Sequence, residues 1–199
     1  MNIHSVTTGK RETILAAARA LFAERTFAGT PMPLVAERAG IGVGTIYRYF
    51  PSKEALGNAV FQDAKRTLYA YLAVGEQATS VRDGMYAMWR GLAAFAREHS
   101  EAFAFLEHQH HGAYLDADSL ALSARNEEIS LHLIRLGQQA GEVRDGDPGM
   151  FLALVLGAFV GLDKAARSAC RPLTDDDIEA SAGPVWDLLR ATSPKESAP

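Results

Sequence analysis

The chain has 199 residues, of which 48% are apolar and 22% charged, as is typical of a soluble globular protein with one or two domains. Its single cysteine, Cys170, excludes an internal disulfide framework and favours a reducing compartment. The net charge of −4 is uneven, because residues 1–60 hold seven basic and four acidic residues whereas the remainder holds thirteen basic and twenty acidic residues. A basic N-terminal part on an acidic body can bind phosphate with one end only.

Apolar residues recur at helical spacing along almost the whole chain, which predicts an all-α fold of about nine helices. In the N-terminal third, the expected helices cover about residues 10–26, 31–40, 43–49 and 52–71. Thr30 is placed to cap the second helix, with Pro31 at its first position, and Gly40 ends it in the left-handed conformation. Pro51 ends the third helix, and Ser52 caps the fourth.

The rest of the chain is expected to form longer helices beyond a loop at residues 75–80. These helices cover about residues 85–96, 101–110, 122–141, 148–168 and 174–189, the last two being capped by Asp147 and Thr174. The longest apolar stretch, Met150–Leu162, is too short to cross a bilayer, and residues 1–10 lack the apolar core of a secretory signal. We therefore expect a cytoplasmic protein with no membrane partner.

Residues 29–56 read GTPMPLVAERAGIGVGTIYRYFPSKEAL, a helix, a tight glycine turn and a short second helix. Ile41 and Ile46 are expected to point inward, with help from Tyr47 and Phe50. The residues left outside are Gly42, Val43, Gly44, Thr45 and Arg48. Small residues at the front of a helix let it lie deep in a major groove, and its free N–H groups favour phosphate. The pattern predicts a helix-turn-helix that binds double-stranded DNA.

The stretch from Ala39 to Leu56 resembles the DNA-binding head of the tetracycline-repressor family, A-G-[IV]-[SG]-x-G-T-[IL]-Y-x-[YH]-F-x-[SD]-K-E-x-L. The preceding run, Arg11–Phe27, is similar to the family's first helix. The resemblance implies a transcriptional repressor that binds a palindromic operator as a homodimer and is released by a small-molecule effector. It assigns residues 1–55 to DNA binding and residues 56–199 to effector binding and dimerisation, with the fourth helix joining the two parts.

The resemblance also implies individual DNA contacts. Backbone contacts fall on Thr30, Thr45, Tyr47, Tyr49 and Lys53, and base contacts fall on or beside Gly42, Val43, Gly44 and Arg48. Val43 departs from the family pattern, which often has lysine there; valine can contact a thymine methyl but cannot pair with a phosphate or a guanine. Phe50 is expected to be a core residue, whereas Tyr47 and Tyr49 are expected to turn their rings inward and their hydroxyls outward.

The C-terminal part is rich in aromatic and methionine side chains, which either fill the core or line an effector cavity. The candidate effector-binding residues are Met85, Met88, Trp89, Phe105, His108, Tyr114 and Asn126. Asn126 lies on the apolar stripe of its helix and needs hydrogen-bond partners if it is buried. The run Glu107-His108-Gln109-His110-His111 has the spacing of metal ligands on a helix. Because it lies near a helix end with no cysteine nearby, we expect no metal and no cofactor.

Dimerisation is expected through the last two helices. The helix from Pro148 is apolar on nearly every face and must be covered all round, and Gly157 and Gly161 would let another helix come close. The last helix adds Ile178, Val185 and Trp186. Two heads would then meet half-sites roughly 34–36 Å apart on B-form DNA.

Two other classes of protein are the alternatives to a DNA-binding regulator. An enzyme is not indicated, because the sequence has no glycine-rich phosphate loop after a strand, no nucleophile elbow and no paired metal motif. A helical interaction or ligand-sensing module that does not bind DNA stays open, because Val43 replaces lysine and the total charge is acidic. In the regulator hypothesis, an effector lowers DNA affinity by preferring a conformation whose heads are wrongly spaced, with the fourth helix as the lever.

Overall fold

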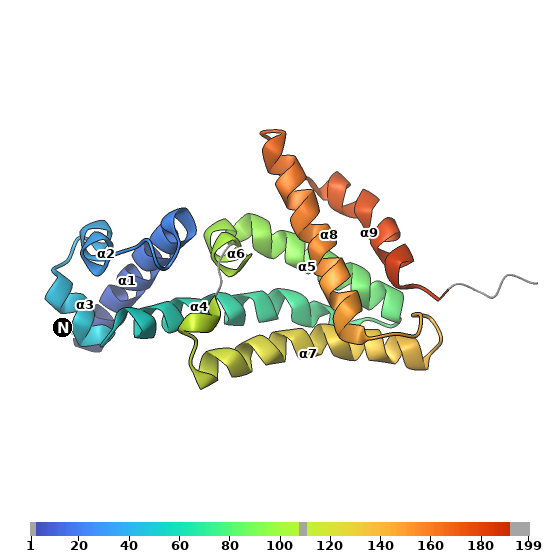
Figure 1. Ribbon diagram of the computed structural model, residues 1–199, viewed down its shortest axis with the longest axis horizontal. Coiled ribbons are helices and arrows are strands. Elements are labelled where there is room, and N and C mark those ends of the chain that lie inside the picture. Colours follow the sequence, from blue (N-terminus) through green and yellow to red (C-terminus); the bar gives the residue numbers. More distant parts are fainter. Residues whose placement is uncertain (1–2, 108–110, 192–199) are drawn as a thin grey trace, which may run out of the picture. The chain divides into compact units, whose positions relative to one another are not determined.

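The computed structural model describes residues 3–107 and 111–191, and within these ranges every regular element is a helix apart from one isolated bridge between Val143 and Arg190 (Figure 1). The elements are α1 (Ile3–Arg25), α2 (Met32–Ala39), α3 (Val43–Tyr49), α4 (Lys53–Leu72), η1 (Ala73–Gln77), α5 (Val81–Glu98), α6 (Ser100–Glu107), η2 (His111–Ala113), α7 (Ala117–Gln139), α8 (Pro148–Ser168) and α9 (Asp175–Leu189). The all-α prediction is confirmed. Helix α1 begins earlier than residue 10, and η1 is a 3₁₀ helix where a loop was expected.

The chain divides into two compact units, Met1–Thr67 with Glu98–Ala124, and Leu68–Arg97 with Arg125–Pro199. Helix α4 runs without interruption through residue 55, where the sequence placed a domain boundary, and supplies its last turn to the second unit. The first unit therefore contains α6 as well as the three N-terminal helices.

The core of the first unit joins α1, α2, α3, α4 and α6. Its fully buried side chains include Leu21 and Phe22 of α1, Val35 of α2, Ile46 of α3 and Phe105 of α6. Removing an aliphatic or aromatic side chain of this size from water contributes about 1.5–3 kcal/mol, so this shared core fixes the short helices α2 and α3. Neither could fold alone, because a helix of two turns has too few internal hydrogen bonds.

The entry to α2 differs from the prediction. Thr30 does not cap the helix; Pro31 occupies the cap position, and the buried Thr30 hydroxyl donates to the carbonyl oxygens of Thr26 at 2.8 Å and Leu21 at 3.3 Å. These bonds hold the chain between α1 and α2 close to the core. The end of α2 is as expected, since Gly40 has a φ of 66° and its N–H closes the helix.

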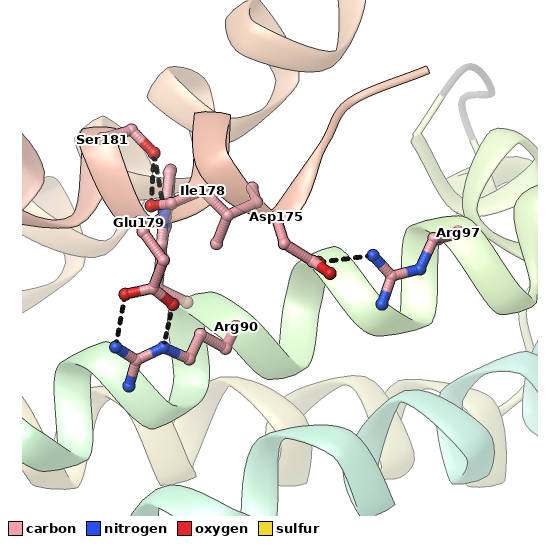
Figure 2. Close-up of polar contacts among 7 residues, drawn as sticks. Arg90, Arg97, Asp175, Ile178, Glu179 and Ser181 are labelled. Carbon is pink, nitrogen blue, oxygen red and sulfur yellow. Dashed lines mark hydrogen bonds and ion pairs between the residues drawn. The ribbon is translucent and has the colours of Figure 1, made fainter.

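The second unit is built on α5, α7, α8 and α9, of which α8 and α9 contact each other (Figure 1). The predicted caps are confirmed: Asp147 accepts from the N–H groups of Gly149 and Met150, and Thr174 forms a capping box with Asp177. Figure 2 shows how α9 is tied to α5, with Arg97 donating to Asp175 at 2.6 Å and Arg90 holding both carboxylate oxygens of Glu179. These pairs are exposed, so they orient α9 more than they stabilise it.

Candidate functional site

Helix α3 is held at one side and exposed on the other. Ile46 is fully buried and Phe50, at the end of the helix, is 3% exposed, so these two side chains anchor it to the core of the first unit. Gly42, Gly44 and Arg48 lie on the exposed side. The bounds of α3, Val43–Tyr49, are those predicted. The N-terminal end and one face of α3 are thus accessible to a binding partner.

The glycines at the front of α3 are not needed by the fold. A Cβ atom at Gly42 or Gly44 would meet no other heavy atom within 4 Å, and Gly42 has an ordinary φ of −72°. Gly57 of α4 is different, because a Cβ there would lie 2.6 Å from Cε2 of Phe27. Neither packing nor backbone conformation therefore explains Gly42 and Gly44. Their effect is to let an external surface approach the backbone of α3 closely.

The two tyrosines of α3 differ in exposure. Tyr47 is 47% exposed, so the expectation that its ring turns inward is wrong; α3 is too short to bury two consecutive side chains, and Ile46 takes the inward position. Tyr49 is half-buried and packs against the core of the first unit, in agreement with a ring inside. Val43 and Thr45 are half-buried beside the exposed glycines. Tyr47 and Arg48 thus form the outermost side chains of α3.

Lys53, the first residue of α4, is tied to the segment between α1 and α2. Its ammonium nitrogen lies 3.3 Å from the carbonyl oxygen of Ala28 and 4.6 Å from the ring centre of Phe27. Partial burial lowers the pKa of the Lys53 ammonium. The Phe27 ring in turn stacks on Tyr114 at 3.9 Å, so a continuous stack links Lys53 to the segment before α7.

Arg11 is a basic residue beside the end of α3 that the sequence analysis did not single out. Its guanidinium carbon lies 5.2 Å from the ring centre of Phe50, which brings the charge of α1 next to the end of α3. Two other arginines of the unit are paired with acids: Arg38 pairs with Glu24, and Arg19 pairs with Asp63 and Glu101. The excess of basic residues in residues 1–60 indicated a phosphate-binding end, but only the tertiary contact with Phe50 distinguishes Arg11 from the other basic residues.

Three of the predicted effector residues line one cavity in the second unit. Met85, Met88 and Trp89 of α5 surround it together with side chains of α7, α8 and α9. Phe105 and Tyr114, by contrast, do not line this cavity in the described part of the chain. Phe105 is a fully buried core residue of the first unit, 5.8 Å from Phe22 between ring centres, because α6 packs on α1. Asn126 is buried on α7, 4% exposed, and His108 lies outside the described residues.

The histidine cluster is described only at His111. One ring nitrogen, Nδ1, lies 2.6 Å from the Tyr114 hydroxyl, and Nε2 lies 2.9 Å from the carbonyl oxygen of Phe105. Burial raises the pKa of Tyr114, which keeps its hydroxyl neutral and able to donate. His111 thus has a structural role, and the residues that the structure describes contain no group of three candidate metal ligands. His108 and His110 lie outside that part of the chain.

The comparisons with known proteins decide the family. Residues 14–60 match the family described as "Bacterial regulatory proteins, tetR family", and residues 61–191 match the "Tetracyclin repressor-like, C-terminal domain". The chain belongs to the TetR family. Because the two matches adjoin at residues 60 and 61, they cover both the head and the larger helical part of a TetR protein.

Individual relatives agree with the TetR assignment. The HTH-type transcriptional regulator UidR of Escherichia coli K12 is 38% identical over 68 residues, which cover 34% of this chain and 35% of UidR. The HTH-type transcriptional repressor KstR of Mycolicibacterium smegmatis is 41% identical over 71 residues, 33% of this chain and 35% of KstR. The chain thus matches about a third of the length of each. A TetR family regulator from Marinobacter aquaeolei VT8 shares the fold, with a TM-score of 0.81, 23% identity and coverage of 96% of this chain and 100% of that one.

Lys53 is the expected DNA-backbone contact whose removal is most simply measured. We expect Lys53→Ala to weaken binding to all DNA sequences by a similar factor and to reduce the salt dependence by about one unit of slope. Fluorescence anisotropy with labelled duplexes over a series of salt concentrations measures both quantities. Lys53→Arg keeps the charge and should restore the slope. A loss confined to one base position would contradict a phosphate contact.

Arg11 gives a second test of the DNA interface expected around α3. Among the described residues neither Arg11 nor Arg48 forms an ion pair, so their charges are available to phosphate. Arg11→Gln is expected to lower operator affinity and to reduce the salt slope by about one unit. Arg19→Gln is the matched control, since Arg19 is already paired within the unit and its loss should leave the slope unchanged. Equal slopes for wild type and Arg11→Gln would remove Arg11 from the interface.

Proposed function

We propose that this TetR family protein is a ligand-responsive transcriptional repressor that binds a palindromic operator as a homodimer and is released by a small molecule. The observation that carries the proposal is the exposed front of α3, where Gly42 and Gly44 leave open space that the fold does not require. UidR and KstR are named as a transcriptional regulator and a repressor, which supports the same function and no catalytic one. We further infer that the protein acts in the cytoplasm.

The proposed DNA interface follows the geometry of α3 and its neighbours. Base edges would be met by Gly42, Val43, Gly44 and Arg48, and the DNA backbone by Thr45, Tyr47, Tyr49, Lys53 and Arg11. Thr30 is excluded from the proposed interface, because its side chain is fully buried and its hydroxyl is bonded to two carbonyl oxygens. Sequence selectivity would come chiefly from Arg48 and from apolar contact between Val43 and a thymine methyl.

Helix α8 supports the proposed dimer. The helix is 21 residues long and extends beyond the apolar stretch from Met150 to Leu162. Among the described residues it is the one helix that is long and apolar enough to cross a membrane. Only 22% of its most apolar window is buried within the chain, and Leu154 is 49% exposed. Gly157 and Gly161 have open space in front of them. We infer that a second copy, and not a lipid bilayer, covers this face.

The contribution of α9 to the dimer differs from the sequence-based expectation. Ile178 and Val185 are buried within the chain, 3% and 7% exposed, because α9 packs on the unit's own helices. Trp186 is half-buried, and the apolar side chain that α9 leaves outside is Leu188, 40% exposed. The proposed seam therefore uses Leu188 together with the open face of α8.

Helix α4 supports the proposed coupling between effector and DNA. It begins at Lys53, in the proposed DNA interface, and ends at Leu72, which lines the cavity with Met85, Met88 and Trp89. A ligand that displaces Leu72 acts on one end of a continuous helix whose other end holds the head. An effector can lower DNA affinity only by the difference between its affinities for the two conformations.

The proposed function is tested by measuring binding of the purified protein to the DNA upstream of its own gene. We expect nanomolar binding at physiological salt, two half-sites centred about 34–36 Å apart, and competition by specific but not by random duplex. Footprinting gives the spacing, and anisotropy gives the affinity. Binding no tighter than to random DNA would favour a helical ligand-sensing module without a DNA partner.

A further inference from the structure

A second cavity lies next to the proposed effector cavity, and Met88 lines both. The first, inner cavity has a volume of about 40 Å³ and lies among α5, α7, α8 and α9. The second, outer cavity has a volume of about 300 Å³ and lies between the segment Gly75–Val81 and α7. Met88 lines both cavities and is the residue they share. Its side chain is therefore the wall between them.

The inner cavity is almost entirely apolar. Its walls are leucine, isoleucine, valine and methionine side chains, with Trp89 and Ser130 as the residues that carry side-chain polar atoms. The Trp89 indole N–H is already used, since it donates to the Ser181 hydroxyl at 3.0 Å, and that hydroxyl donates to the Ile178 carbonyl (Figure 2). An apolar lining of this kind favours hydrocarbon over a polar group. Its occupant should be an uncharged apolar group.

The outer cavity is larger and carries polar groups. Glu76, Thr79, Ser80 and His132 line it beside Ile129 and other apolar side chains, and no lysine or arginine does so among the described residues. Ser80 is engaged at the start of α5, where its hydroxyl lies 2.8 Å from the Asp83 carboxylate. The carboxylate of Glu76 makes this end of the site unfavourable for an anion and favourable for a cation or a hydrogen-bond donor.

The Met88 side chain, which separates the two cavities, is conformationally adaptable. Methionine is unbranched and has three rotatable bonds, so Met88 has more alternative rotamers than a branched side chain would have. The inner cavity alone is too small for a metabolite, because ligand cavities commonly have volumes of about 300–1,000 Å³. Displacement of the Met88 thioether would join the two spaces into one elongated site with an apolar end and a polar end.

We propose that the effector is an elongated amphipathic molecule whose hydrocarbon part passes Met88 into the inner cavity and whose neutral or cationic polar end stays beside Glu76 and His132. This inference rests on the proposed effector function and adds the chemical class of the ligand. The hydrocarbon supplies affinity through burial, and the polar end sets the direction of binding. Fatty carboxylates are disfavoured because their charge would face Glu76 with no cation among the lining residues.

The experiment uses the full-length protein at pH 8 with the uncharged dye N-phenyl-1-naphthylamine as a fluorescent probe. We expect 1-decanol and decylamine to displace the dye at concentrations about tenfold lower than decanoate does. Shortening the alcohol to 1-hexanol should weaken displacement, because the inner cavity is no longer filled. Equal displacement by decanol and decanoate would overturn the assignment of the polar end.

Two variants test the two ends separately. Glu76→Lys should reverse the preference and improve decanoate about tenfold, whereas Glu142→Lys, an exposed acid outside both cavities, should leave the ratio unchanged. Val155→Phe fills the inner cavity and should remove the dependence on chain length while circular dichroism shows a folded protein. An unchanged ratio in Glu76→Lys, or an unchanged chain-length dependence in Val155→Phe, would overturn the proposal.

Operator anisotropy on the same samples separates the two claims. Selective decanol binding with no effect on DNA affinity supports the ligand class and contradicts the regulatory function. Decanol-sensitive operator binding with equal response to decanoate supports the regulatory function and contradicts the ligand class.

Discussion

Gly44→Glu is expected to weaken operator binding at least a hundredfold and to leave the free energy of unfolding almost unchanged. A Cβ atom at residue 44 would meet nothing within 4 Å, and Gly44 is exposed, so we expect the fold to tolerate a side chain there. In the proposed complex, the same side chain would hold α3 away from the major groove and place a carboxylate against the phosphates. Anisotropy measures the affinity, and urea unfolding followed by circular dichroism measures the stability.

Gly44→Ala is a more discriminating variant, because it should increase the stability of the fold and decrease the affinity for the operator. Alanine in place of a helical glycine raises the free energy of unfolding by about 0.5–1 kcal/mol, while the added methyl still opposes close approach to DNA. Gly57→Ala is the contrasting variant: its Cβ would lie 2.6 Å from Phe27, so unfolding should become easier by about 1–3 kcal/mol. Normal operator binding by Gly44→Glu would remove α3 from the DNA interface.

Leu154→Glu should convert the proposed dimer into a monomer and thereby abolish tight operator binding. Leu154 is 49% exposed on α8, so a carboxylate there is solvated in a monomer but buried without a partner in the proposed dimer, which costs several kcal/mol. A single head meets only one half-site, and operator affinity should fall at least a hundredfold. Sedimentation velocity at micromolar concentration gives the oligomeric state, and anisotropy gives the affinity.

The matched control for the dimer is Leu120→Glu. Leu120 is 55% exposed on the part of α7 that belongs to the first unit, so it receives the same chemical change at similar exposure outside the unit that contains α8 and α9. It should remain a dimer with normal operator binding. If Leu154→Glu were dimeric, or if wild type were monomeric at micromolar concentration, the proposed seam on α8 would be wrong.

The sequence by itself determined the helices and the head. Periodicity, Gly40 after α2 and Pro51 after α3 are local signals that act within one or two turns, so they predict where α2 and α3 end. The residue pattern from Ala39 to Leu56 is also a local signal, and the family model that matches residues 14–60 agrees with the TetR family that this pattern indicated. Likewise, Asp147 and Thr174 cap their helices through N–H groups two or three residues away.

Only the tertiary structure decided which apolar side chains face a cavity and which basic side chains remain unpaired. Phe105 and Trp89 lie on similar helical stripes, but α6 packs on α1 and buries Phe105 in the core, whereas α5 turns Trp89 toward a cavity. Arg11 reaches Phe50 while Arg19 is paired with acids of two other helices. These outcomes depend on contacts between segments far apart in the chain, and periodicity within one helix carries no information about its neighbours.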